Sequence, residues 1–174
     1  MSSQLKVAVS DQDHTQGNSS APLTLTEYGD YQCSYCGEAY SLVKEAQEAL
    51  GDKLQFVFRN FPLSEAHPYA TAAAQAAEAA GKQGKFWPMH DLLYENQEAL
   101  TNEDLLAYAQ EAGLDVVQFR TEFESDAVSQ KVGSDFESGI RSGVNGTPSL
   151  FVNGEKYEGD WQDGALTAFL KGKL

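Results

Sequence analysis

The sequence predicts an α/β fold, in which a mixed central sheet is flanked by helices and interrupted by an inserted all-helical subdomain. Residues 23–58 show a strand, a helix and a second strand, the order of a parallel βαβ unit. Residues 64–144 are helical in pattern, and residues 145–174 return to a β-hairpin and a helix. We therefore expect an N-terminal arm over residues 1–21, a core of residues 22–63 and 145–174, and a helical insertion over residues 64–144.

The βαβ unit rests on a change of hydrophobic period along the chain. Alternation and β-branching favour strands over residues 23–28 and 54–58. Between them apolar side chains recur at helical spacing, and Gly51 ends the helix. The arm is expected to be irregular, apart from a short strand at residues 5–9. The apolar positions of the helix are Cys36, Ala39, Tyr40, Val43, Ala46 and Leu50.

Five helices are predicted for the insertion. Pro68 suits the first turn of a helix that ends at Gly81, and a second helix spans residues 86–96. Thr101 and Asp115 can cap the third and fourth helices. Every fourth residue of the fifth helix is apolar, which predicts a buried stripe. That stripe consists of Val128, Val132, Phe136 and Ile140.

The last thirty residues carry hairpin signals. Residues 149–152 are typical of a strand, and Asn153-Gly154 predicts a tight turn into a return strand that begins at Lys156-Tyr157. A helix is expected over residues 160–170.

The formal net charge of -14 bears on the partners of the protein. It repels phosphate backbones and anionic lipid surfaces, so nucleic acid and membrane partners are not expected. No stretch approaches the roughly 18 apolar residues of a membrane span, so no membrane insertion is expected. Residues 1–17 lack the apolar run of a secretory signal, which predicts a cytoplasmic location. The alternative is a periplasmic or other extracytoplasmic location for a chain whose leader has been removed.

The two cysteines have C-x-x-C spacing, as Cys33 and Cys36. They close too small a loop to stabilise the fold, so a redox role is favoured. Cys33 lies where a strand ends and a helix begins, and unpaired N–H groups there lower a thiol pKa below about 8.5. We expect an exposed Cys33 to be the nucleophile and a buried Cys36 to be the resolving thiol, with no cofactor.

Two other interpretations of the cysteine pair remain open. Zinc requires four ligands, and beside carboxylates the chain offers only His14, His67 and His90, so no metal site is assigned. Two buried, inert cysteines are the second alternative.

Glu27 is a candidate proton carrier. It alternates with Leu23 and Leu25, which places its side chain in the core beneath the cysteines. A buried carboxyl has a raised pKa and can exchange a proton with Cys36 near neutrality. The alternative is a register shift that exposes Glu27.

Four further side chains are assigned structural roles. We expect His67 and His90 at helix ends and in the packing of the insertion, and Trp87 in the core of the insertion. Tyr40 is expected to pack on the sheet.

Residues 27–37 (EYGDYQCSYCG) and 146–154 (GTPSLFVNG) resemble the DsbA-like branch of the thioredoxin superfamily. Residues 58–63, 67–68 and 84–91 are similar to its helical insertion, and the match runs from about residue 22 to residue 170. The resemblance implies a thioredoxin-like fold.

The same resemblance implies roles for individual residues. Glu27, six residues before the first cysteine, occupies the position of the family's buried acid. The Thr147–Pro148 peptide would be cis and lie next to the cysteines, and the Thr147 backbone would pair with an extended substrate. The expected substrate-binding residues are Thr147, Pro148, Ser34 and Tyr35.

The resemblance further implies a protein thiol–disulfide oxidoreductase that exchanges disulfides with protein or small-molecule thiols. Its redox partner and the direction of electron flow are left open. Strongly oxidising members carry proline and histidine between their cysteines, whereas this chain has Ser34 and Tyr35, so we expect a less oxidising couple. The alternative is a thioredoxin-fold binding or scaffold module without redox turnover.

Overall fold

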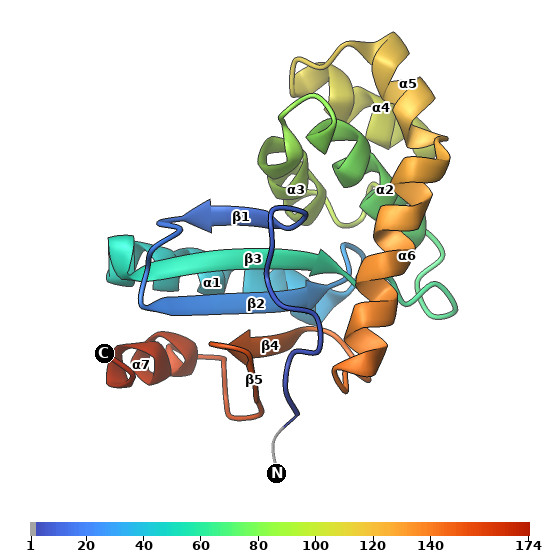
Figure 1. The fold of residues 1–174 in the computed structure, drawn as a ribbon. Coiled ribbons are helices and arrows are strands. Elements are labelled where there is room, and N and C mark those ends of the chain that lie inside the picture. Colours follow the sequence, from blue (N-terminus) through green and yellow to red (C-terminus); the bar gives the residue numbers. More distant parts are fainter. Residues whose placement is uncertain (1–2) are drawn as a thin grey trace.

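A five-stranded mixed sheet is the centre of the fold in the computed structural model, which describes residues 3–174. The strand order is β1-β3-β2-β4-β5, with β2 and β3 parallel and the other neighbours antiparallel. Figure 1 shows the strands as neighbouring arrows through the middle of the molecule. The strands are β1 His14–Gly17, β2 Leu23–Gly29, β3 Leu54–Asn60, β4 Ser149–Val152 and β5 Glu155–Tyr157.

Helix α1 (Ser34–Leu50) connects the two parallel strands, as the βαβ prediction requires. It covers one face of the sheet and contacts α7 (Ala165–Gly172). The predicted apolar positions of α1 are buried, except that Tyr40 is half-buried. Gly51, with a φ of 56°, ends the helix in a conformation that glycine adopts without strain. A single 3-10 turn, Gly51–Lys53, leads into β3.

The five helices predicted between the two β regions are present. In Figure 1 the first four gather above β1, at one edge of the sheet, and α6 runs down past the end of β3. Thr101 and Asp115 cap α4 and α5 as predicted, and Thr101 forms a capping box with Asp104. The helices are α2 Ala70–Gly81, α3 Phe86–Glu95, α4 Asn102–Glu111, α5 Val116–Phe123 and α6 Asp126–Arg141.

The buried face of α6 differs from the predicted stripe. Val128 and Val132 are buried, but Phe136 is half-buried and Ile140 is 54% exposed. A step of four residues overshoots the helical turn by about 40°, so the stripe rotates away from the sheet. Small and polar side chains take over the contact. They are Asp135, Ser138 and Gly139.

Three predicted boundaries are wrong for local reasons. Residues 5–9 form no strand, because this segment crosses the face of the sheet (dark blue in Figure 1) and Leu5 packs in a small apolar cluster. The strand of the arm is β1, paired with β3. Helix α7 begins at Ala165, because Asp163 and Gly164 have positive φ angles that no helix admits. Helix α2 begins two residues after Pro68.

Within residues 3–174 no helix combines the length and the apolar character needed to cross a bilayer.

Candidate active site

Cys33 and Cys36 lie at the junction of β2 and α1. Cys33 is the N-cap residue of α1, and Cys36 lies in its first turn. Both are free thiols. The prediction that Cys33 is exposed is wrong, because only 6% of its surface is accessible. Cys36 is fully buried, as predicted. The carbonyl oxygen of Thr147 covers Cys33 and accepts a hydrogen bond from its thiol at 3.6 Å.

The two thiols have opposite acidities. A hydrogen bond from the Cys36 side chain is the main cause that lowers the pKa of Cys33 to about 5. The Thr147 side chain and the backbone N–H of Cys36 also lower it, while burial opposes them. The helix terminus therefore contributes as predicted, but the neighbouring thiol contributes more. Burial, followed by the hydrogen bond to Cys33, raises the pKa of Cys36 far above its ordinary value.

Glu27 is buried beneath the cysteines, in the register that the sequence predicted. Its strand, β2, is the middle strand of the sheet, and Glu27 lies opposite Phe58 on one side and Leu150 on the other. Burial, and then the charge of Cys33, raise the pKa of Glu27 to about 8. A carboxyl with this pKa can give or take a proton near neutrality.

A small cavity of about 10 Å³ lies beside Glu27. This is close to the smallest space that holds one water molecule. Its wall includes the buried His90 and also residues nearer the surface on α1 and α3. The remaining lining residues are Gln16, Tyr40, Val43, Lys44, Gln47, Phe56 and Asp91.

The other predicted site residues surround the cysteines. The Thr147–Pro148 peptide bond is cis, and Thr147 contacts Cys33 through its carbonyl. Ser34 is exposed and Tyr35 is 60% exposed, so both are accessible at the surface. The structure thus brings the predicted substrate-binding residues to the N-terminus of α1.

Asp30 is a site residue that the sequence reasoning missed. Its side chain is fully buried and accepts hydrogen bonds from the backbone N–H groups of Gln32 and Leu63, at 2.8 and 2.9 Å. It also bonds Nδ1 of His67 at 2.8 Å, so His67 binds next to the active site rather than at a helix end. The charge of Asp30 disfavours the thiolate of Cys33. The local signal was the aspartate itself, because an Asp side chain commonly accepts a hydrogen bond from the backbone N–H two residues further along the chain.

An aromatic cluster on α3 lies under the site. The Tyr31 hydroxyl and Nδ1 of the buried His90 are hydrogen bonded at 2.8 Å. Tyr40 stacks on Tyr94 of α3 and donates to Glu95, so the prediction that it packs on the sheet is wrong. The long tyrosine side chain reaches past the sheet to the neighbouring helix.

Trp87 also differs from its predicted place. Its indole N–H donates to the carbonyl of Thr15 in β1 at 3.0 Å, and its ring packs on Phe56. It therefore joins α3 to the sheet instead of filling the core of the insertion. Among residues 3–174 no group of three or more His, Cys, Asp or Glu side chains could hold a metal ion.

Comparison with known proteins assigns the family. A family model described as thioredoxin matches residues 9–172. The chain therefore belongs to the thioredoxin family.

Solved structures place its fold among the DsbA-like members of the superfamily. A thioredoxin-like oxidoreductase from Silicibacter pomeroyi superposes with a TM-score of 0.81 at 26% identity, over 95% of each chain. Oxidised BdbD from Bacillus subtilis gives 0.84 at 22% identity, over 99% of this chain and 96% of that one. The thiol-disulfide exchange protein alpha-DsbA2 from Wolbachia pipientis gives 0.80 at 19%, over 94% and 88%.

Curated relatives of similar sequence carry a different name. The Na(+)/H(+) antiporter NhaA 1 of Salinispora arenicola is 43% identical over 158 residues, which are 91% of this chain and 24% of the antiporter. NhaA of Herminiimonas arsenicoxydans is 40% identical over 159 residues, 91% and 25% of the two chains. This chain spans about a quarter of the length of these relatives, so the antiporter activity in their names is that of much longer proteins.

Proposed function

We propose that this protein is a thiol–disulfide oxidoreductase, which exchanges disulfides with protein thiols through Cys33 and Cys36 and needs no bound cofactor. The asymmetry of the cysteine pair carries the proposal. Cys33, with a pKa of about 5, is a thiolate at neutral pH, whereas the buried Cys36 keeps its proton. Thiol–disulfide exchange needs an attacking thiolate and a second thiol that is activated only after the first step.

The steps follow from these protonation states. The Cys33 thiolate attacks a substrate disulfide, one substrate sulfur leaves as a thiolate, and a mixed disulfide forms. Cys36 then loses its proton to Glu27 and attacks the sulfur of Cys33. The second substrate sulfur leaves, so the substrate gains two electrons and the protein holds a Cys33–Cys36 disulfide. Run in reverse, the same steps oxidise a dithiol substrate.

The surroundings of Cys33 support the predicted substrate contacts. The Thr147 backbone borders Cys33, and the exposed ring of Tyr35 lies two residues away along the chain. In our proposal an extended substrate segment lies along Thr147 and Pro148 and packs against Ser34 and Tyr35.

Two features bear on the potential of the couple. A lowered pKa of Cys33 stabilises the reduced form and makes the pair more oxidising. The Ser34-Tyr35 dipeptide supplies no histidine to add to this effect. We propose a potential between the roughly -270 mV of a reductase such as thioredoxin and the roughly -120 mV of DsbA.

Equilibration with glutathione buffers, read by mass spectrometry of the trapped thiols, tests this function. We expect one reversible intramolecular disulfide, and a mixed disulfide through Cys33 that accumulates in Cys36→Ser but not in Cys33→Ser. If Cys33 and Cys36 never form a reversible disulfide, the proposal is wrong. A scaffold module would instead bind its partner equally well in the wild type and in both variants.

A further inference from the structure

Tyr94 presents a buried hydroxyl that has no hydrogen-bond partner among residues 3–174. Its ring is well packed on α3, with ring centroids 4.7 Å from Tyr31, 5.1 Å from His90 and 5.3 Å from Tyr40. Burying an unpaired hydroxyl costs free energy. Phenylalanine would make the same ring contacts without that cost. Packing therefore accounts for the ring of Tyr94 but not for its hydroxyl.

Glu27 presents a second unpartnered buried atom, Oε2, and the two atoms converge. A Cβ at Gly29 would lie 2.7 Å from Oε2 of Glu27 and 2.9 Å from the Tyr94 hydroxyl oxygen. Both oxygens thus approach the same point over Gly29, and the glycine leaves the space that this approach needs. Their separation cannot exceed the sum of these two distances, so one bridging water or a small side-chain rotation can join them, although no direct hydrogen bond does so in the structure.

Cys36 belongs to the same group of atoms. The backbone N–H of Asp30, next to Gly29, favours the Cys36 thiolate, and the charge of Glu27 opposes that thiolate. Burial, followed by the charges of Cys36 and Glu27, raises the pKa of Tyr94 well above its ordinary value. Tyr94 therefore keeps its proton and remains a hydrogen-bond donor wherever Glu27 is ionised.

The other polar groups near Glu27 are engaged elsewhere or are the reacting thiols. Tyr31 and His90 bond each other, and the Tyr40 hydroxyl donates to Glu95. Asp30 is bonded to His67, and Lys44 and Asp91 face each other at 3.7 Å nearer the surface. The titratable groups around Glu27 are Cys33, Cys36, Tyr40 and Lys44 from α1 and its cap, Asp30 and Tyr31 from the loop before it, and His90, Asp91 and Tyr94 from α3.

We propose that the Tyr94 hydroxyl donates a hydrogen bond to Oε2 of ionised Glu27, directly or through one water, and so positions Glu27 as the base for Cys36. This rests on the proposed function. In the step concerned, the Cys36 proton passes to Glu27 and a Cys36–Cys33 bond forms. The Cys33–substrate bond breaks, and the substrate sulfur leaves with the electron pair of that bond. Tyr94 is a positioning residue, because in this proposal it acts on the reaction through Glu27 and not on the sulfurs themselves.

The variant Tyr94→Phe tests the proposal, with Tyr40→Phe as the matched control. Loss of a donor to a carboxylate should raise the titration midpoint of Glu27 by about one pH unit. We would measure that midpoint by ¹³C NMR of the reduced protein, which needs no turnover. The rate at which Cys36 releases a chromogenic thiol from Cys33 should fall about tenfold below the midpoint, and its pH profile should move by the same amount. Tyr40→Phe should change neither value.

The Tyr94 hydroxyl has no partner in the structure, and at pH 6 Glu27, with a pKa of about 8, is mostly protonated. Tyr94→Phe should therefore melt at the same temperature as the wild type or higher at pH 6. An unchanged Glu27 midpoint and an unchanged pH profile in Tyr94→Phe would overturn the proposal. This failure is distinct from failure of the proposed function, in which the wild type itself forms no reversible disulfide.

Discussion

Two buried carboxyl groups flank the cysteine pair, and the protein treats them in opposite ways. Asp30 accepts two backbone N–H groups and a histidine nitrogen, all within 2.9 Å. Glu27, three residues earlier and inside β2, has an oxygen without a partner and a pKa of about 8. The contrast teaches that burial alone does not define a buried acid. The donors around it also matter: Asp30 is fully hydrogen bonded, whereas Glu27 has an unpartnered oxygen and the raised pKa of a proton carrier.

The cysteines repeat this contrast. The Cys36 side chain, and after it Thr147 and the Cys36 backbone, lower the pKa of Cys33, so its thiolate is favoured. For Cys36 burial dominates, and its thiol form is favoured. Asp30 and Cys33 therefore form the hydrogen-bonded side of the site, and Glu27 and Cys36 form its proton-holding side.

Replacement of Glu27 by leucine should have the largest effect on stability. It should raise the free energy of unfolding relative to the wild type, and this gain should grow with pH. The pKa of Glu27 is raised from 4.5 to about 8 on folding, so the wild type loses stability as the pH rises between these values. The leucine variant lacks this loss, and its advantage in unfolding free energy should grow by about 5 kcal/mol between pH 4 and pH 9. Urea unfolding of the reduced protein measures it.

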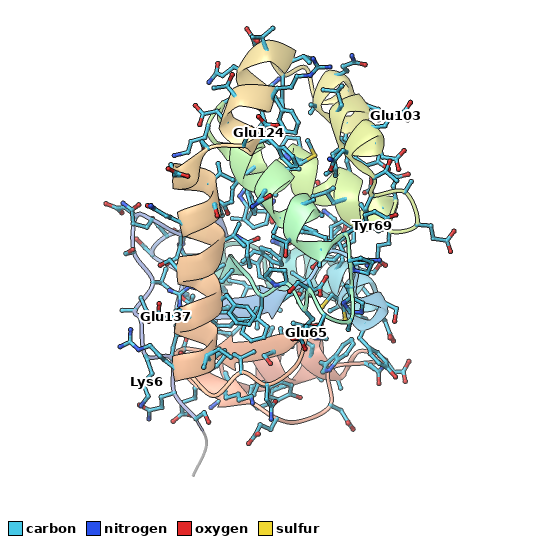
Figure 2. All side chains as sticks on the ribbon, turned by 90° about the vertical axis from the view of Figure 1, so that its right-hand side faces the viewer. Lys6, Glu65, Tyr69, Glu103, Glu124 and Glu137 are labelled. Atoms are coloured by element: carbon cyan, nitrogen blue, oxygen red, sulfur yellow. The ribbon has the colours of Figure 1, made fainter. Side chains whose placement is uncertain are left out.

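The matched control for that experiment is Glu65→Leu, since Glu65 is an exposed acid in the loop before α2 (Figure 2). Its difference from the wild type should not depend on pH. If the difference in unfolding free energy between Glu27→Leu and the wild type is also independent of pH, Glu27 does not have a raised pKa and does not belong to the proton-holding side of the site.

Asp30→Ala should lower the free energy of unfolding, whereas Glu27→Leu raises it. The alanine leaves the buried N–H groups of Gln32 and Leu63 without an acceptor, which should cost about 3 kcal/mol at pH 7. Asp30→Asn keeps an acceptor oxygen and should lose less. Denaturant midpoints measure both, and a loss below about 1 kcal/mol for the alanine variant would contradict the role of Asp30 as the acceptor of these backbone N–H groups.

Glu27→Gln should separate the two chemical steps. The amide cannot accept the Cys36 proton, so the release of a thiol from the mixed disulfide should slow about 100-fold at pH 8.5. The attack of Cys33 on a substrate disulfide should change much less. Stopped-flow measurement of both steps tests this, and equal slowing of the two would contradict a role of Glu27 specific to Cys36.

Thr147→Val should have the smallest effect. The valine removes a hydroxyl that lowers the pKa of Cys33 and that has no hydrogen-bond partner among the described residues. We expect the pKa of Cys33 to rise from about 5 by roughly half a unit. The absorbance of the thiolate, followed as the pH is changed, measures this pKa. Thr121→Val on α5 is the control, and an unchanged Cys33 pKa in Thr147→Val would show that the hydroxyl does not reach the sulfur.

Much of the architecture could be predicted because its signals are local. The period of apolar residues in α1, the caps Thr101 and Asp115, and the Asn153-Gly154 turn each act within a few residues. Ile140 shows the limit of this reasoning. Its spacing matches a buried stripe, but the crossing of α6 over the sheet turns it to solvent.

The sequence by itself determined the order of strands and helices, the position of Cys33 and Cys36 at a helix start, and the inward direction of Glu27, because periodicity and spacing are properties of neighbouring residues. Only the tertiary structure decided which groups surround these side chains. It bonds Asp30 to His67 and brings the Tyr94 hydroxyl to Glu27 over Gly29. Such contacts join residues far apart in the chain, and the packing of α3 and the loop before α2 against the sheet creates them.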